Sequence, residues 1–189
     1  MTLAHLLRTA PPARRRDIAD DLVFTIDGIL SPEEALALIS AADDLGFEPA
    51  PITVGPGRFR MAPHIRDNTR VMVDDFGLAA AIWERLRPWV HPEAIGVNER
   101  FRVYRYERGQ AFRWHLDGSF RRPGEASRHS VLIYLNDDFE GGRTEIEGCG
   151  SVEPRTGRAL LFDHRIEHQG APVSAGTKYV LRTDLMFRG

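Results

Sequence analysis

Two histidines and an aspartate are the residues of this sequence whose spacing is best suited to chemistry. His115 and Asp117 are separated by one residue, and His168 follows Asp117 after 50 intervening residues. Polar and apolar side chains alternate from Phe112 to Asp117, which is the pattern of a half-buried β-strand. Side chains at positions i and i+2 of a strand leave the same face, so His115 and Asp117 can converge on one ion. With His168 as third ligand, the sequence predicts a metal site.

A ligand set of two imidazoles and one carboxylate leaves room for other molecules on the metal. Non-haem Fe(II) oxygenases use this arrangement, because a co-substrate and O2 must both reach the iron. The His-x-Asp tripeptide is a weak signal by itself. Its alternating context strengthens it, since polar side chains inside a barrel are costly unless they bind something. The same ligands with a water molecule would also suit a zinc hydrolase.

One other histidine competes for the place of third ligand. His164 lies four residues before His168, but residues 163–165 look like a turn, whereas residues 169–173 continue His168 as a strand. We therefore prefer His168. The remaining histidines fall where solvated or structural roles are expected: His5, His64, His91 and His129.

The only lysine of the chain also suggests a function. Of the 25 basic residues, 24 are arginine and one is Lys178, ten residues after His168. Residues 173–177 predict a tight hairpin, which would return Lys178 beside the strand of His168, roughly 13 Å from that ligand. A buried carboxylate needs a paired cation, and a slim ammonium fits a narrow barrel better than a guanidinium. We expect Lys178 to bind the far end of a small dicarboxylate that chelates the metal.

The elements that must position these residues are two helices followed by many short strands. Ser31, Pro32 and Glu34 open a helix that ends near Gly46, and a second helix is expected at about 75–87. A strand at 22–26 precedes them, residues 49–68 are expected to be a loop, and residues 10–16 a frayed arm within a flexible segment 1–20. Further strands are expected at 101–106, 111–117, 129–135, 143–147, 158–163, 168–173 and 178–187. This order predicts a mainly β (α+β) fold, and we favour a double-stranded β-helix, or jelly roll, buttressed by the helices.

Bulk composition narrows the class of protein further. A length of 189 residues predicts a single domain over 1–189, with the jelly-roll core at 98–187. The net charge of −2 gives no broad field for nucleic acid, and no apolar run is long enough to span a membrane. Cys149 is the only cysteine, and the N-terminal segment lacks the features of a signal peptide. We expect a soluble cytoplasmic protein that binds neither nucleic acid nor membrane; the oligomeric state stays open.

Three segments resemble a known family. Residues 101–117, residues 130–144, and His168 to Val173 with Gly176 to Lys178 resemble prolyl-4-hydroxylase-like 2-oxoglutarate/Fe(II) dioxygenases, over about residues 98–187. The resemblance implies a jelly roll in which His115, Asp117 and His168 bind iron and Lys178 binds the distal carboxylate of 2-oxoglutarate. It also implies that Tyr106 hydrogen-bonds this carboxylate and that Thr144 assists.

The implied reaction is hydroxylation of a substrate by O2, coupled to decarboxylation of 2-oxoglutarate to succinate and CO2. The resemblance points to peptidyl-proline or an amino-acid-like compound as substrate, and it is compatible with ascorbate as an auxiliary reductant. An unrelated small metabolite and a catalytically inactive cupin-like binding domain remain as alternatives.

One arginine and one polar stretch have roles that the sequence leaves open. Arg182 is expected on the same strand face as Lys178, where it would bind substrate or co-substrate or form an ion pair with Asp184 or another acid. Arg66, Asn68 and Arg70 would form either a lid or, as we prefer, a solvated loop.

Overall fold

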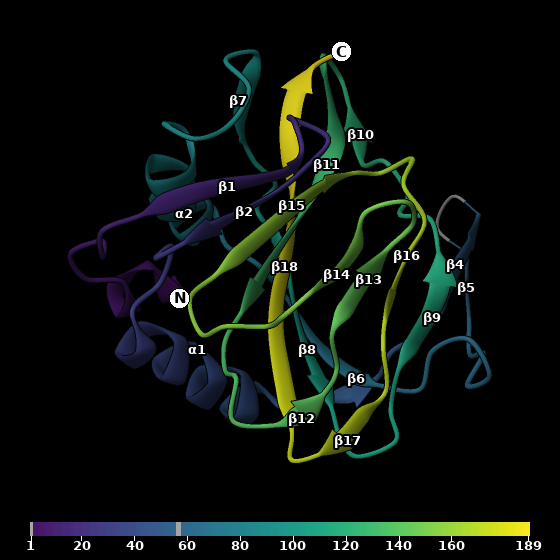
Figure 1. The fold of residues 1–189 in the computed structure, drawn as a ribbon. Coiled ribbons are helices and arrows are strands. Elements are labelled where there is room, and N and C mark those ends of the chain that lie inside the picture. Colours follow the sequence, from purple (N-terminus) through teal and green to yellow (C-terminus); the bar gives the residue numbers. More distant parts are fainter. Residues whose placement is uncertain (1, 56–57) are drawn as a thin grey trace.

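The computed structural model describes residues 2–55 and 58–189, and two facing antiparallel sheets dominate it (Figure 1). The larger sheet has the order β1-β2-β15-β11-β18-β8-β6-β3, with β10 beside β11 and β7 beside β18. Its strands are β1 (Arg14–Ala19), β2 (Val23–Asp27), β3 (Glu48–Pro49), β6 (Thr69–Asp74), β7 (Ala94–Val97), β8 (Arg100–Tyr106), β10 (Arg121–Arg122), β11 (Glu125–Tyr134), β15 (Ala159–Asp163) and β18 (Lys178–Arg188).

The smaller sheet covers one face of the larger one and has the order β14-β13-β16-β9. Its strands are β9 (Phe112–His115), β13 (Thr144–Ile146), β14 (Gly150–Val152) and β16 (His168–Gly170). Two further pairs are β4 (Ile52–Gly55) with β5 (Arg58–Arg60), and β12 (Glu140–Gly141) with β17 (Val173–Ala175). The expectation of a mainly β jelly roll with N-terminal helices is confirmed.

Alternation along the strands divides the interior into two cores. Val103 of β8 and Leu181 of β18 belong to the core that includes the helices, whereas their neighbours Tyr104 and Val180 belong to the core between the two sheets. Successive side chains of a strand point to opposite faces, so one sheet serves both cores. The space between the sheets is the lumen in which the polar residues of interest lie.

Two helices pack on the outer face of the larger sheet, as expected: α1 (Pro32–Leu45) and α2 (Phe76–Leu86), with a short 3-10 helix η1 (Leu3–Leu6) beside them. The capping box expected at the start of α1 is present, because Ser31 accepts from the Glu34 amide and the Glu34 carboxylate accepts from the Ser31 amide. Asp75 is the N-cap of α2, and its side chain accepts from the Leu78 amide. Within the described residues, no helix is long and apolar enough to cross a membrane.

The expectation of a flexible arm at 1–20 is wrong. Residues 14–19 form the edge strand β1, which pairs with β2. The guanidinium of Arg15 lies 3.9 Å from the centre of the Phe24 ring and donates to the carbonyl of Trp89 at 2.5 Å. The arginines that suggested a frayed tail instead attach this segment to the sheet.

Two further expectations about connections need correction. Residues 49–68 are not simply a loop, because they contain the β4–β5 hairpin, and Arg66 and Asn68 are buried rather than solvated. Residues 173–177 do not fold β18 back beside β16. Val173–Ala175 pairs with β12, while β18 joins β11 and β8 in the opposite sheet. Between Ala175 and Lys178 the chain passes into the larger sheet, so Lys178 faces His168 from the opposite sheet.

Candidate active site

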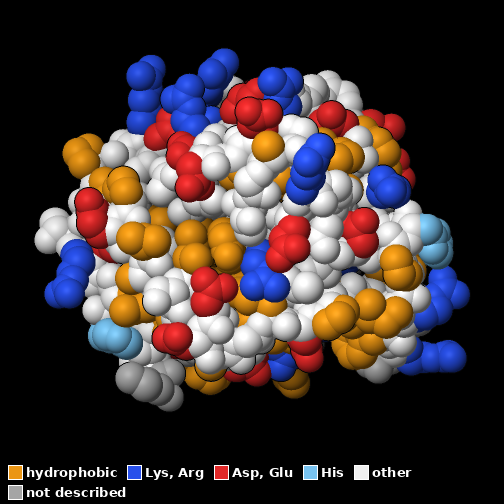
Figure 2. Space-filling view, turned by 90° about the horizontal axis from the view of Figure 1, so that it is seen from below, with side chains coloured by type: hydrophobic (Ala, Val, Ile, Leu, Met, Phe, Trp, Pro, Cys, Tyr) orange, Lys and Arg blue, Asp and Glu red, His pale blue; other side chains and the backbone are white. Residues whose placement is uncertain are grey.

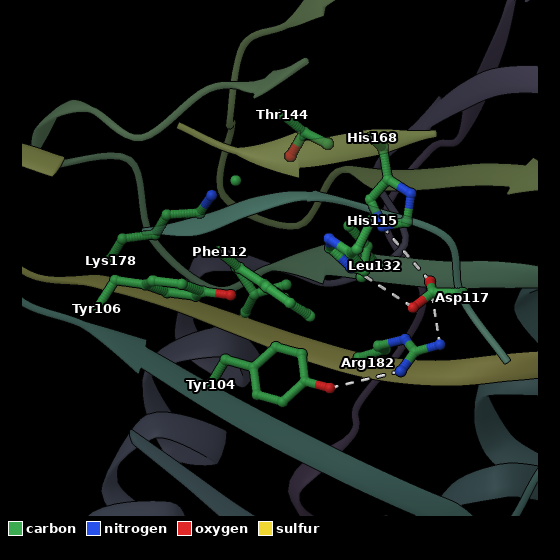
Figure 3. A pocket seen from close by; sticks show the side chains of 12 residues that line it. Tyr104, Tyr106, Phe112, His115, Asp117, Leu132, Thr144, His168, Lys178 and Arg182 are labelled. Atoms are coloured by element: carbon green, nitrogen blue, oxygen red, sulfur yellow. Dashed lines mark hydrogen bonds and ion pairs between the residues drawn. The ribbon is translucent and has the colours of Figure 1, made fainter. Parts of the chain in front are cut away.

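The structure brings His115, Asp117 and His168 together at the mouth of the lumen (Figure 3). His115 on β9 and His168 on β16 are direct neighbours across the smaller sheet. Asp117 lies just past the end of β9, which is shorter than the strand expected at 111–117. One ligand atom from each residue lies within 4.8 Å of the others, so the three side chains are arranged as metal ligands would be.

Backbone carbonyls fix which nitrogen of each histidine faces the shared centre. Nδ1 of His115 lies 2.7 Å from the carbonyl of Arg113, and Nδ1 of His168 lies 3.1 Å from that of Ile166. The Nε2 atoms face Asp117, at 3.7 Å and 3.5 Å from its carboxylate oxygens. A hydrogen bond at one ring nitrogen sets the tautomer that leaves the other free for a metal.

Burial keeps both imidazoles neutral. It lowers the pKa of His115 to about 3, with His168 adding to the effect, and it also lowers the pKa of His168. The carboxyl of Asp117 has a pKa far below its usual range, because the Arg182 guanidinium and the hydrogen bond from Ser130 counter the opposing effect of its burial. Neutral imidazoles and an ionised carboxylate are the protonation states that a divalent cation requires.

Ser130 and Arg182 hold the carboxylate of Asp117 in place. The Ser130 hydroxyl donates to Oδ2 at 2.5 Å, and Arg182 Nη2 lies 3.0 Å from the same oxygen. His164, the alternative third ligand, is instead hydrogen-bonded to Ser130 and to Ser127 on the far side of Asp117. The structure therefore places His164 behind the carboxylate and leaves His168 facing it.

A cavity extends from the triad into the lumen. Lys178 lines it and is 3% exposed. Its Nζ donates to the carbonyl of Gly142 at 2.6 Å, and desolvation lowers the pKa of Lys178 to about 7. An ammonium has three donors, so a buried one with a single hydrogen bond is suited to bind a carboxylate.

Two hydroxyl groups face the same cavity as Lys178. Tyr106 lies opposite Lys178 in the β8–β18 register, with its ring centre 5.3 Å from Nζ. Thr144 accepts from the Tyr134 hydroxyl at 2.7 Å, which leaves its own proton free to donate. All three side chains project into one space (Figure 3). The triad at one end and Lys178 at the other fit a metal-chelating dicarboxylate.

A wider cleft leads to the triad from outside. Arg66, Arg70, Arg102 and Arg182 line it together with Tyr104. Burial opposes ionisation of the Tyr104 hydroxyl, but Arg66, Arg182 and Arg102 outweigh it and lower the pKa of Tyr104 to about 8.

The sequence did not reveal the roles of Ser130, Tyr104 and Arg66. Tyr104 and Ser130 lie in segments that resemble the known family, but the resemblance implies no role for either, and Arg66 is expected in a lid or a solvated loop. A signal was present in one case: Arg66, Asn68 and Arg70 alternate at strand spacing, and Arg70 lies in β6.

Comparison with known proteins agrees with this geometry. The model of the 2OG-Fe(II) oxygenase superfamily matches residues 101–183, the segment that carries the triad and Lys178. Residues 101–183 resemble members of the 2OG-Fe(II) oxygenase superfamily. The protein is thus an oxygenase that uses Fe(II) and 2-oxoglutarate for hydroxylation. No curated protein matches the sequence significantly.

Solved structures share the fold of this oxygenase across most of its length. The viral collagen prolyl hydroxylase of Paramecium bursaria Chlorella virus-1, in complex with 2-oxoglutarate, is 21% identical with a TM-score of 0.68, covering 91% of this chain and 99% of its own. A Pseudomonas putida prolyl-4-hydroxylase is 19% identical with a TM-score of 0.65, covering 100% of both chains. A Trichoplax adhaerens prolyl hydroxylase in complex with a hypoxia-inducible-factor peptide is 20% identical with a TM-score of 0.68, covering 90% of this chain and 86% of its own.

Proposed function

We propose that His115, Asp117 and His168 hold the iron of this oxygenase and that Lys178, Tyr106 and Thr144 hold the distal carboxylate of 2-oxoglutarate. The observation that carries this assignment is the single cavity lined by both the triad and the buried Lys178. A metal site alone would suit several reactions. A metal site that faces a buried ammonium with a single hydrogen bond suits a chelating dicarboxylate.

When bound, iron and 2-oxoglutarate supply the oxidising chemistry, in which O2 converts 2-oxoglutarate to succinate and CO2 while the substrate is hydroxylated. The protein positions these groups. Lys178 neutralises the far carboxylate, Tyr106 donates a hydrogen bond to it, and burial in the lumen excludes water and strengthens both contacts. Ser130 and Arg182 orient Asp117 from behind, as partners of metal ligands commonly do.

We propose peptidyl-proline or an amino-acid-like compound as the substrate, hydroxylated at a carbon presented through the outer cleft. The support is the fold shared with prolyl hydroxylases, one of which is in complex with a peptide fragment. A small metabolite unrelated to amino acids remains the second candidate. Its support is that the cleft is lined by several arginines, whereas Arg182 is the one arginine that lines the inner cavity. We also propose a cytoplasmic location, which suits the single cysteine.

Anaerobic titration with Fe(II) and 2-oxoglutarate tests the site. We expect the weak visible charge-transfer band of the chelate to form in the wild-type protein and to be absent after His168→Ala or Asp117→Ala, since each removes a ligand. Lys178→Met should leave iron bound but weaken 2-oxoglutarate by about tenfold or more, as expected when a buried charge-assisted hydrogen bond is lost.

His164→Gln is the matched control for these variants. His164→Gln removes an imidazole beside the triad that we do not assign to the metal, so the band should survive it. If His164→Gln abolished the band and His168→Ala did not, our assignment of the third ligand would be wrong. Turnover with Zn(II) and without 2-oxoglutarate would instead support a hydrolase, and iron binding without any succinate release would support an inactive binding domain.

A further inference from the structure

The outer cleft is rich in guanidinium groups and poor in acids. Five arginines line it: Arg66, Arg70, Arg102, Arg121 and Arg182. The carboxylates of its described lining are those of Asp184 and the proposed metal ligand Asp117. Asp184 is shared by two arginines, at 3.2 Å from Arg182 and 3.7 Å from Arg102. Among the described residues, neither Arg66 nor Arg70 has a carboxylate within 4.0 Å, although Glu48 lies opposite Arg70 across the β3–β6 pair.

The strand register forces three of these arginines together. Arg102 of β8 lies directly opposite Arg182 of β18, and Arg70 of β6 lies opposite Tyr104, two residues along the same face from Arg102. Like charges directly opposite each other on a sheet destabilise it. Burial, together with Arg66 and Arg102, lowers the pKa of Arg70 against the opposing effects of Tyr104 and Glu48. This repulsion is a cost that a bound anion would remove.

Several of the buried guanidinium nitrogens also lack hydrogen-bond partners. Among the described residues, none bonds to Arg66 Nη2, Arg70 Nε, Arg102 Nη1 or Arg182 Nε. Arg66 is 5% exposed, and its Nε donates to Asn68 at 2.7 Å, while its guanidinium lies 4.3 Å from the Tyr104 ring centre. Its plane is thus held in place while one amino group remains free. Buried polar groups without partners are costly unless a ligand satisfies them.

This cluster is distinct from the 2-oxoglutarate pocket. Lys178 lines the inner cavity and not the cleft, whereas Arg66, Arg70 and Arg102 line the cleft and not the inner cavity. Arg182 lines both and stands between them. A carboxylate at Lys178 therefore leaves the arginines of the cleft free for a second anion.

On the basis of the function proposed above, we propose that the substrate is anionic and binds through a carboxylate or phosphate to Arg66 and Arg70, with Arg102 assisting. Guanidinium groups match both oxyanions and can bind them with two parallel hydrogen bonds. The mouth of the cleft adds exposed apolar side chains: Trp114 is 46% exposed and Phe59 is 60% exposed. These side chains suit an apolar body that carries the acidic group, as in an acylated amino acid.

Paired compounds that differ only in charge test the proposal. Acylated amino acids are compared with their amides, and phosphomonoesters with the parent alcohols. Binding is measured by calorimetry to the full chain with Mn(II) and 2-oxoglutarate, and succinate release is measured with Fe(II). We expect the acids or the phosphomonoesters to bind at least about tenfold more tightly than their neutral partners. The two series show which oxyanion is used.

Charge-removing variants locate the binding groups. Arg66→Gln and Arg70→Gln should each reduce the preference for the anion about tenfold or more, whereas Arg108→Gln, which removes an exposed charge outside the cleft, should leave it unchanged. Arg66→Lys keeps the charge but not the planar fork, so it should retain part of the preference. Because Arg70 is only half-buried, its variant tests the site even if Arg66→Gln does not fold.

The outcomes separate this inference from the function on which it depends. Equal binding of the acidic and neutral compounds, or an unchanged preference in both glutamine variants, would overturn the anionic substrate while the charge-transfer band still reported a working iron site. Loss of that band from the wild-type protein would instead overturn the proposed function. A preference abolished by Arg108→Gln would place the anion outside the cleft.

Discussion

At the scale of single residues, Lys178 combines deep burial with few hydrogen bonds. Its ammonium lies among Tyr106, Tyr134 and the carbonyl of Gly142, with no described carboxylate at ion-pair distance. Desolvation therefore lowers the pKa of Lys178 to about 7 in the protein without its co-substrate. A dianion placed beside the ammonium would raise this pKa again, because an opposite charge favours the charged form.

We predict that 2-oxoglutarate binding weakens as the pH rises above about 7. Above that value Lys178 is neutral in the co-substrate-free protein, so binding must be coupled to proton uptake, and affinity falls by up to about tenfold per pH unit. Calorimetry in buffers of different ionisation enthalpy would measure the proton uptake. Lys178→Met should bind weakly at all pH values and take up no proton at this site.

The same shift has a consequence for stability. The pKa of Lys178 is lower in the folded protein than its ordinary value of 10.5, so between about pH 7 and pH 10.5 the unfolded chain binds more protons. This residue therefore makes the co-substrate-free protein more stable as the pH rises through that window. A contribution of the opposite sign, obtained from the difference between wild type and Lys178→Met, would contradict the assigned burial.

At the scale of elements, the β12–β17 pair determines where the lysine can lie. Gly142 follows β12 with φ of +62°, and a Cβ at this position would meet Phe139 Cε2 at 2.9 Å and Lys178 Cδ at 3.2 Å. The absence of a side chain thus lets the lysine stem pass over the backbone and donate to the Gly142 carbonyl. Contact with Phe139 and Lys178 thus explains why a glycine stands at position 142.

We predict that Gly142→Ala weakens 2-oxoglutarate binding and lowers the free energy of unfolding by about 2–4 kcal/mol, from left-handed backbone strain together with overpacking. Gly148→Ala is a matched control, because Gly148 has φ of +72° but nothing lies within 4 Å of its added Cβ. The control should lose only about 1–2 kcal/mol and keep its affinity for 2-oxoglutarate. Chemical denaturation and calorimetry measure both quantities, and equal effects of the two substitutions would count against a steric role for Gly142.

Elements with strong local signals were predictable from the sequence. The capping box of Ser31 and Glu34 located α1, and the alternating run at 101–106 located β8. The path after Val173 was not predictable, because a hairpin and a crossing of the lumen use the same turn residues. Arg66 was assigned to a solvated loop because its burial depends on the rings of Tyr104 and Phe112, which are distant in sequence.

At the scale of the whole molecule, charge is distributed without a dominant sign. The net charge is −2, and acidic and basic side chains are interspersed on the face shown in Figure 2. In the outer cleft, by contrast, the lining contains five arginines and two aspartates. Screening by salt is weaker for buried charges than for exposed ones, so recognition in the cleft should persist at moderate ionic strength.

We predict that Mn(II) and 2-oxoglutarate together raise the melting temperature well above the value with either alone, because the dicarboxylate connects the two sheets through the metal and Lys178. At about 100 times the dissociation constant, a ligand specific for the folded state stabilises it by about 2.7 kcal/mol, or about 5–10 °C for a chain of this size. Differential scanning calorimetry measures the shift. Asp117→Ala should remove the mutual enhancement, and a purely additive effect of the two ligands in the wild-type protein would argue against a shared site.

The longest strand, β18, carries both Lys178 and Arg182 on its inner face and pairs with β8, β11 and β7. This strand therefore fixes a distance of four residues, about 13 Å, between Lys178, which would bind the co-substrate, and Arg182, which faces the substrate. Because β18 is anchored on both sides, its register cannot slip, and a slip of one residue would turn both side chains out of the lumen. Substitutions near Arg182 and in the cleft could then change which substrate is bound. The Lys178 end would still accept a dicarboxylate of one length.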